Sequence, residues 1–144
     1  MLPNKVGKQL GHPTYSLTEK FKGKKKEQIS RGKAVLYCSD LVAMPIEENT
    51  VDKVFHCNCY YFWPDLKAGA RAIHRVMKPG GTMVTALRLD SVKKVASKNM
   101  FSGESWRPEV YMEALQSSGF TDVRMENKRE KLITFQAIFA TAVK

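Results

Sequence analysis

The stretch VDKVFHCNCYYFWPDL, residues 51–66, and the segment MKPGGTMVTALR, residues 77–88, decide the fold of this chain. The first predicts a buried strand that runs into an aromatic-rich turn. The second predicts the end of a helix, a glycine pair and another buried strand. Nucleotide-binding folds usually combine such units with a glycine-rich loop after their first strand. No G-x-G-x-x-G loop precedes these two segments, so the sequence has the later parts of such a fold without its usual first part.

The two segments are joined by the clearest helix in the sequence. Apolar residues recur at spacings of three and four from Leu66 to Met77, which predicts a helix from Asp65 to Lys78. Pro79 would end this helix, and Gly80 and Gly81 would reverse the chain. The unit formed is therefore strand, helix, strand.

Five further elements are predicted from the same kinds of pattern: a weak helix over 15–32, a strand over 34–38 (AVLYC), a helix over 108–118, and strands over 120–126 and 132–143. Strands that alternate with helices predict an α/β fold with a mostly parallel sheet. The polar segment NKREK, 127–131, predicts a turn, and the two closing strands predict an antiparallel hairpin at one edge.

The 144 residues are enough for one domain with a real core. We expect a basic arm and helix over 1–33 and one α/β domain over 34–144. No apolar run approaches the roughly 20 residues that cross a membrane, and the N-terminus lacks the apolar middle of a secretory signal. A cytoplasmic protein is the default expectation.

The formal net charge of +10 is concentrated at one end of the chain. Residues 1–33 hold nine Lys and Arg against two Glu. This segment could bind phosphate groups or a membrane surface, or it could be a solvated amphipathic helix. Aromatic residues do not interleave with the basic ones and no zinc-finger spacing is present, so nucleic acid is an unlikely partner.

Three cysteines, Cys38, Cys57 and Cys59, give no disulfide framework and fit a reducing compartment. A strand through HCNC would place His56 and Asn58 on one side and the two neighbouring cysteines on the other. We therefore expect no metal site, with the cysteines acting as small core residues.

Ligands in open α/β sheets bind beyond the carboxyl ends of the strands. Asp40 follows the first predicted strand, although such a residue can also be only a turn or cap residue. The segment from His56 to Trp63 follows the second, and Arg88 and Asp90 follow the third. In that aromatic run, Phe62 and Trp63 are expected to fill the core. Tyr60 and Tyr61 are the expected pocket residues, because buried hydroxyls need partners.

These residues resemble the class I S-adenosylmethionine-dependent methyltransferases of the type-11 kind, from about Phe21 to Lys144. The resemblance is carried by DLVAMPIEENTVDKVF, with Pro45 and Asp52 at their family spacing, by NCYYFWPD, and by HRVMKPGG. It implies a Rossmann-like methyltransferase sheet, S-adenosylmethionine as cofactor, and direct methyl transfer that relies on proximity and alignment.

The resemblance also implies roles for individual residues. Asp40 would accept a hydrogen bond from the adenine amino group, and the backbone of Leu41 would lie beside the adenine ring. Cys57 and Asn58 would lie near the methionine part of the cofactor. Tyr60 and Tyr61 would face the acceptor substrate.

The sequence departs from the family where the glycine-rich loop and the strand that grips the ribose would stand. Residues 34–144 therefore resemble a partial methyltransferase domain with its N-terminal strands missing. We expect strand 34–38 to pair directly beside strand 51–57, or to be poorly ordered. The function expected is methyl transfer to an unknown acceptor, in a form of low activity. The alternative is a non-catalytic variant that binds a protein partner through exposed sheet edges or, less readily, nucleic acid through its basic helix.

Overall fold

The computed structural model describes residues 26–101 and 103–144. The chain divides into two units, Met1–Pro45 and Ile46–Lys144, which are treated separately below. The boundary that the sequence suggested between residues 33 and 34 stays a prediction.

The first unit has little regular structure among its described residues. Helix α3 spans Lys26–Ser30, and the one-turn 3-10 helix η1 spans Leu41–Ala43. The rest of the helix predicted over 15–32 lies mostly outside the described residues. The strand predicted over 34–38 is wrong, and so is the first alternative, pairing beside 51–57, because these residues form no strand; the second alternative, poor order, stays a prediction. A five-residue strand needs a neighbour for its backbone groups, and Val35 stays 65% exposed without one.

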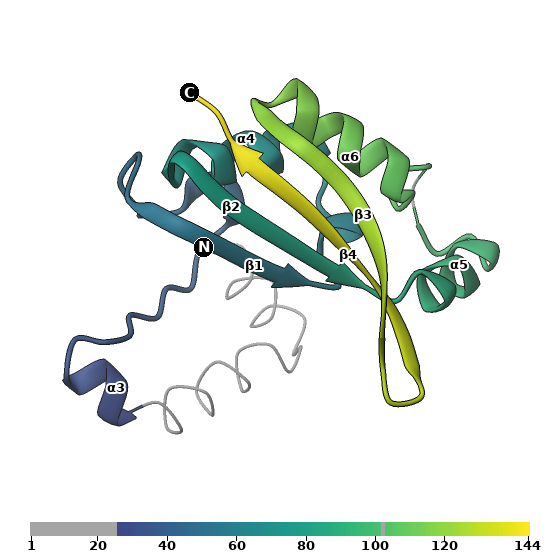
Figure 1. Cartoon of the computed structure of the whole chain (residues 1–144), viewed down its shortest axis with the longest axis horizontal. Helices are drawn as coiled ribbons and strands as arrows, with labels where there is room; N and C mark the ends of the chain where they lie inside the picture. Colours follow the sequence, from purple (N-terminus) through teal and green to yellow (C-terminus); the bar gives the residue numbers. More distant parts are fainter. Residues whose placement is uncertain (1–25, 102) are drawn as a thin grey trace. The chain divides into compact units, whose positions relative to one another are not determined.

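The second unit is built on a four-stranded sheet with the order β1-β2-β4-β3 (Figure 1). The strands are β1 Val51–Cys57, β2 Met77–Leu87, β3 Phe120–Glu130 and β4 Ile133–Ala142. β1 and β2 are parallel, whereas β4 is antiparallel to both of its neighbours. The α/β class, the parallel pair and the closing hairpin are confirmed. Within the described residues the sheet is mixed, with one parallel pairing and two antiparallel ones.

Helix α4, Leu66–Val76, provides the crossover between the parallel strands. The Asp65 carboxylate caps its first turn by accepting the N–H of Ala68 at 3.1 Å. The helix ends two residues before the predicted Lys78, and β2 begins at once. The KPGG segment then bulges out of the ladder, since Val51 pairs with Met77 but Lys53 pairs with Thr82.

Glycine is required at this bulge for two different reasons. Gly80 has φ +80°, in the left-handed region that side chains rarely adopt. A Cβ on Gly81 would lie 2.9 Å from the Asp52 carbonyl oxygen and 3.0 Å from that of Lys78. The Lys78 ammonium also donates to the Asp52 carboxylate at 3.1 Å, which ties the bulge to the start of β1.

Two helices and the hairpin follow β2. Helix α5 spans Leu89–Ser97, and helix α6 spans Pro108–Ser117, which confirms the predicted helix over 108–118. The prediction of NKREK as a turn is wrong. β3 continues to Glu130 and pairs there with Ile133, so the turn is only Lys131 and Leu132. The strands extend past the core as a ribbon exposed on both faces, so polar residues there do not interrupt pairing.

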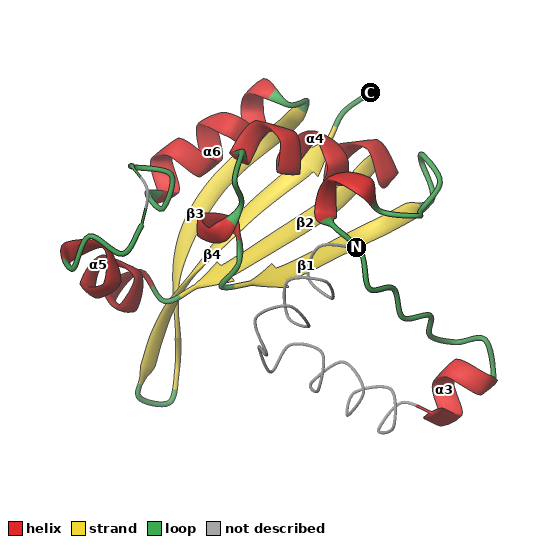
Figure 2. Cartoon of the chain, turned by 180° about the vertical axis from the view of Figure 1, so that it is seen from behind, coloured by secondary structure: helices red, strands yellow, loops and turns green. Residues whose placement is uncertain are grey.

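The core lies between the sheet and helices α4 and α6, which cover the same face (Figure 2). Ile73, Met83, Tyr111, Leu115 and Ile138 are all at most 4% exposed there. Burying a side chain of this size contributes about 1.5–3 kcal/mol.

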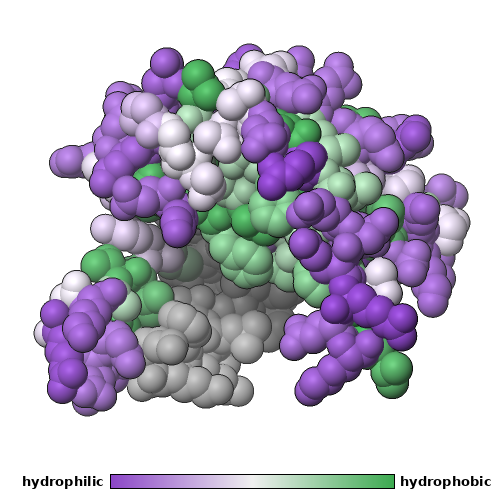
Figure 3. Space-filling model, viewed as in Figure 1, coloured by the Kyte–Doolittle hydropathy of each residue, from purple (hydrophilic) through white to green (hydrophobic). Residues whose placement is uncertain are grey.

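No described helix of the second unit covers the opposite face of the sheet. One row across that face is Phe55, Val84, Phe139 and Arg124, in register on β1, β2, β4 and β3. Apolar side chains gather in the middle of this face (Figure 3). Phe55 is 70% exposed, and the Arg124 guanidinium lies 4.7 Å from the centre of the Phe139 ring.

Candidate functional site

The chain turns sharply where β1 ends. Asn58 has φ +53°, and its backbone N–H donates to the Ala86 carbonyl on β2 at 3.0 Å. The one-turn 3-10 helix η2, Tyr60–Phe62, follows. The prediction that His56 and Cys59 lie on opposite sides is wrong. The left-handed residue between them breaks the strand alternation, and the Cys59 sulfur returns to 3.1 Å from His56 Nδ1.

His56 is the centre of a polar network inside the second unit. Its Nε2 lies 3.0 Å from the Tyr111 hydroxyl on α6 and 3.0 Å from the Thr85 hydroxyl on β2. Those two hydroxyls are 2.7 Å apart. The network therefore joins β1, β2, α6 and the turn after β1 around one imidazole.

Burial keeps this network neutral. It lowers the pKa of His56 from 6.5 to about 4, because a charged imidazolium loses its hydration there. Burial, with a smaller contribution from the neighbouring Cys57, raises the pKa of the Cys59 thiol to about 11. The pKa of the Tyr111 hydroxyl is also raised, mainly by burial. At neutral pH the imidazole therefore carries no charge.

The sequence did not identify Thr85 and Tyr111 as partners of His56. Tyr111 lies on the buried face of α6, and Thr85 lies in the middle of β2. The hydroxyl of Tyr111 on a buried helix face is the one sequence signal that could have indicated a partner, because buried hydroxyls are nearly always hydrogen-bonded.

The aromatic residues after β1 differ in burial from the prediction for the core. Tyr60 is fully buried, stacks on Tyr111 with ring centres 4.1 Å apart, and donates its hydroxyl proton to the Trp106 carbonyl at 2.7 Å. Phe62 was expected in the core, which is wrong, because it is 69% exposed. Trp63 is half-buried and packs against Gly69, where a Cβ would come within 2.6 Å of its ring.

A hollow of about 250 Å³ lies beyond the carboxyl ends of β1 and β2. We call it the β1–β2 hollow, and it is lined by Asn58, Tyr61, Phe62, Arg88, Ser91, Val92, Val95 and Phe101. The Tyr61 hydroxyl donates to the Asn58 side-chain oxygen at 3.2 Å, and the Asn58 amide donates to the Cys57 sulfur at 3.2 Å. Asn58 and Tyr61 thus come together in one hollow, with Cys57 beside them. Tyr60 does not line it.

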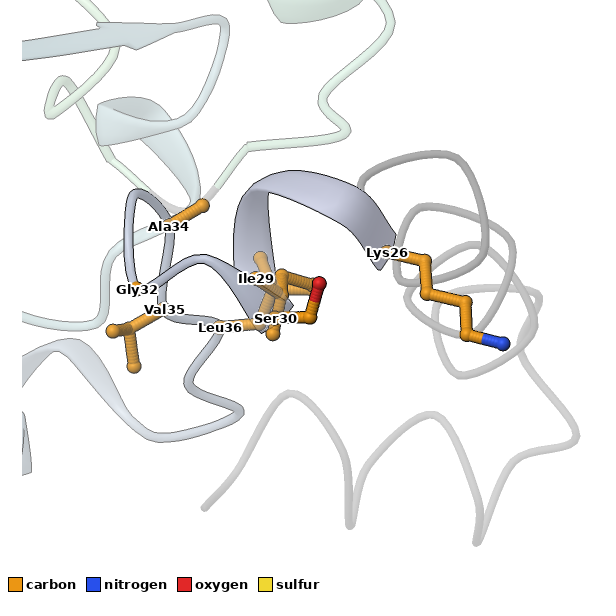
Figure 4. A pocket seen from close by; sticks show the side chains of 7 residues that line it. All are labelled: Lys26, Ile29, Ser30, Gly32, Ala34, Val35 and Leu36. Carbon is orange, nitrogen blue, oxygen red and sulfur yellow. The ribbon is translucent and has the colours of Figure 1, made fainter.

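Asp40 and Leu41 belong to the first unit. The Asp40 carboxylate caps η1 by accepting the N–H of Val42 at 3.3 Å, and Leu41 is the first residue of that turn. A hollow of about 500 Å³ in this unit is lined by Lys26, Ile29, Ser30, Gly32, Ala34, Val35 and Leu36 (Figure 4). It is mostly apolar and contains none of the residues to which the resemblance gives a role.

Two features are absent from the described residues. Over 26–101 and 103–144, no group of three His, Cys, Asp or Glu side chains is arranged to hold a metal ion. In the same residues, no helix is long and apolar enough to cross a membrane.

Comparison with known proteins decides the family. The family model described as "Methyltransferase domain" matches residues 13–85, which is just over half of the chain. The chain belongs to this methyltransferase domain family. Its sheet and helices are those of the Rossmann-like class I methyltransferases, which use S-adenosylmethionine.

One curated relative is the chloroplastic 2-methyl-6-phytyl-1,4-hydroquinone methyltransferase 1 of Oryza sativa subsp. japonica. It is 29% identical over 91 residues, or 60% of this methyltransferase-family chain. The chain spans only 27% of that relative's length.

Two solved structures extend the comparison at the level of the fold. Geranyl diphosphate C-methyltransferase from Streptomyces coelicolor, solved with S-adenosyl-L-homocysteine, matches 83% of this chain and 57% of its own, with a TM-score of 0.62 and 12% identity. The [4+2]-cyclase SpnF matches 82% of this chain and 61% of its own, with a TM-score of 0.59 and 14% identity. A cyclase with the same fold shows that the fold alone does not determine the reaction.

Proposed function

We propose that the chain transfers a methyl group from S-adenosylmethionine to an acceptor at the β1–β2 hollow. The observation that carries the proposal is the hydrogen bond between the Asn58 side chain and the Tyr61 hydroxyl in this hollow. The family resemblance assigns the first to the methionine end of the cofactor and the second to the acceptor, and the two side chains are hydrogen-bonded in one hollow. Donor and acceptor ends of the reaction would therefore be adjacent.

The residues of the hollow fit one part of the cofactor. A sulfonium cation is attracted to the faces of aromatic rings, and Tyr61, Phe62 and Phe101 lie with ring centres 4.8–5.8 Å apart. The Asn58 amide oxygen and nitrogen supply the polar contacts that a methionine amino or carboxylate group needs. When bound, the cofactor supplies an activated methyl group.

The protein's own contribution is positioning. Asn58 and Tyr61 would hold the two reactants in line, and an effective concentration gained by alignment can lower the barrier by about 7–11 kcal/mol. The His56 network supports this arrangement, because it fixes the turn that carries both residues. Asp40 and Leu41 remain our candidates for the adenine contact.

The sequence contains no G-x-G-x-x-G loop, so contacts to the cofactor's ribose and carboxylate are reduced. We therefore propose weak cofactor binding and low activity for the chain as given. Its cytoplasmic location stays a prediction. The rice relative acts, by its name, on a hydroquinone, which makes an aromatic acceptor one candidate.

The test is a calorimetric titration of the whole chain with S-adenosylmethionine and S-adenosylhomocysteine. Asn58→Gly removes the side chain and keeps the left-handed backbone, and Asn49→Gly is a matched control because Asn49 has φ +55°. We expect saturable binding that Asn58→Gly and Asp40→Ala weaken and Asn49→Gly does not. A folded chain that binds neither compound would refute the proposal.

A second candidate function is association through the open edge of β1, and one observation favours it. β1 pairs only with β2 among the described strands, and it carries the exposed Phe55. An unpaired edge strand with an apolar side chain invites strand addition. A second copy of this chain is the simplest partner, because two β1 edges can pair antiparallel about a twofold axis.

Light scattering of the chain at increasing concentration tests this association. Phe55→Lys should shift a dimer to monomer, whereas Leu132→Lys, at the 91% exposed hairpin tip, should not. A parent chain that stays monomeric at high concentration contradicts the association.

A further inference from the structure

We propose that the acceptor at the β1–β2 hollow is a small aromatic molecule that carries an anionic group, and that Arg88 recognises this group. This inference rests on the proposed function and gives it a substrate class. The observations that carry it are the shape of the hollow, its three aromatic rings and the Arg88 guanidinium, which has no ion-pair partner within the described residues.

The hollow is suited to a single ring. Its volume of about 250 Å³ lies below the 300–1,000 Å³ that is typical of pockets for drug-sized ligands. Tyr61 and Phe101 have ring centres 5.4 Å apart at 55°, and Phe62 closes the group at 5.8 Å from Phe101. Rings tilted in this way offer both a face and an edge, so a planar ring packs against them with the offset geometry that aromatic pairs prefer.

Arg88 supplies the charge. It lines the hollow at the end of β2, directly before α5. Across residues 26–101 and 103–144, its guanidinium makes no hydrogen bond or ion pair. Of the five other arginines in this unit, Arg75, Arg107, Arg124 and Arg129 have such partners, and within the described residues Arg71 on α4 has none. An unpaired guanidinium beside apolar walls is complementary to a carboxylate or another planar anion, which it can bind through two parallel N–H donors.

The other lining groups agree with this assignment. Val92 and Val95 on α5 extend the apolar wall, and Asn58 and Ser91 provide neutral polar contacts. The acidic residue closest in sequence is Asp90, which does not line the hollow.

Three probes of similar size separate the parts of the proposal: benzoate, neutral benzamide, and cyclohexanecarboxylate, which is anionic but not aromatic. Their affinities for the full chain are measured by ligand-observed NMR or calorimetry. We expect benzoate to bind about threefold more tightly than benzamide, as one charge-assisted contact with an exposed arginine provides. Cyclohexanecarboxylate should bind several-fold more weakly than benzoate.

Variants assign the effect to residues. Arg88→Gln should reduce the benzoate preference to nearly one, and Phe101→Leu should weaken benzoate and benzamide equally. Arg71→Gln removes one charge from the exposed side of α4 and should leave the preference unchanged. Equal binding of benzoate and benzamide by the parent chain, or a preference that survives Arg88→Gln, would overturn the proposal.

Titration with S-adenosylhomocysteine in the same samples distinguishes this inference from the proposed function. Cofactor binding without benzoate binding would overturn the acceptor class alone. Benzoate binding that depends on Arg88, in a chain that does not bind the cofactor, would refute methyl transfer while supporting an aromatic-anion site.

Discussion

The neutral, buried His56 makes the stability of this protein depend on pH in a definite direction. Burial lowers its pKa from 6.5 to about 4 in the folded chain. The unfolded chain therefore takes up a proton first as the pH falls below 6.5. Stability is complete above that value and is lost as the pH falls from 6.5 towards 4.

The size of the effect follows from these two values. With an unfolded pKa of 6.5 and a folded pKa of about 4, the free energy of unfolding should fall by about 2 kcal/mol between pH 7.5 and pH 5. This window lies above the range in which most carboxylates titrate, so imidazole groups dominate the change within it. Urea unfolding followed by tryptophan fluorescence at several pH values measures the slope.

His56→Gln provides the control, because its amide can bond to the Tyr111 and Thr85 hydroxyls without titrating. The variant keeps the other two histidines, so the difference between the two pH profiles belongs to His56. We expect the parent to lose about 2 kcal/mol more than the variant over this window. Parallel profiles would show that His56 is not held neutral, and the network described above would then be wrong.

Three further substitutions test other parts of the second unit, each by urea unfolding at pH 7.5. Tyr111→Phe should lower the free energy of unfolding by about 1–3 kcal/mol, because it leaves the Thr85 hydroxyl and the imidazole short of a partner; no change would mean that water replaces the hydroxyl. Gly81→Ala should cost about 1–3 kcal/mol, since its Cβ would meet the Asp52 carbonyl oxygen at 2.9 Å. Lys78→Ala should change stability by less than about 1 kcal/mol, because its ion pair with Asp52 is largely exposed, and a larger loss would show that the pair is needed to hold the KPGG bulge.

Elements with a strong local pattern could be predicted from the sequence. The helix after Asp65 has apolar residues at helical spacing and its own cap, and the strand over 51–57 has β-branched and aromatic residues. Both are therefore determined by nearby residues. The strand over 34–38 has an equally apolar composition, but a strand forms only beside a partner, and a linear pattern cannot show whether one is present.

The candidate site was predictable only in part, for a related reason. Asn58 and Tyr61 follow a parallel strand, so the general position of ligand sites in α/β sheets indicated them. Phe62 was assigned to the wrong surroundings, because η2 turns adjacent side chains in directions that a strand pattern does not give. The contacts of His56 with Thr85 and Tyr111 join residues 29 and 55 positions apart, and no local pattern indicates them.

The sharp turn after β1 also makes two neighbouring thiols chemically unequal. Cys57 is exposed beside the β1–β2 hollow, whereas Cys59 is partly buried against the imidazole. In a Cys38→Ser background, a thiol-reactive fluorophore should therefore attach selectively to Cys57. Its emission would report directly on whatever enters the hollow, so binding could be followed in real time without any knowledge of the natural acceptor.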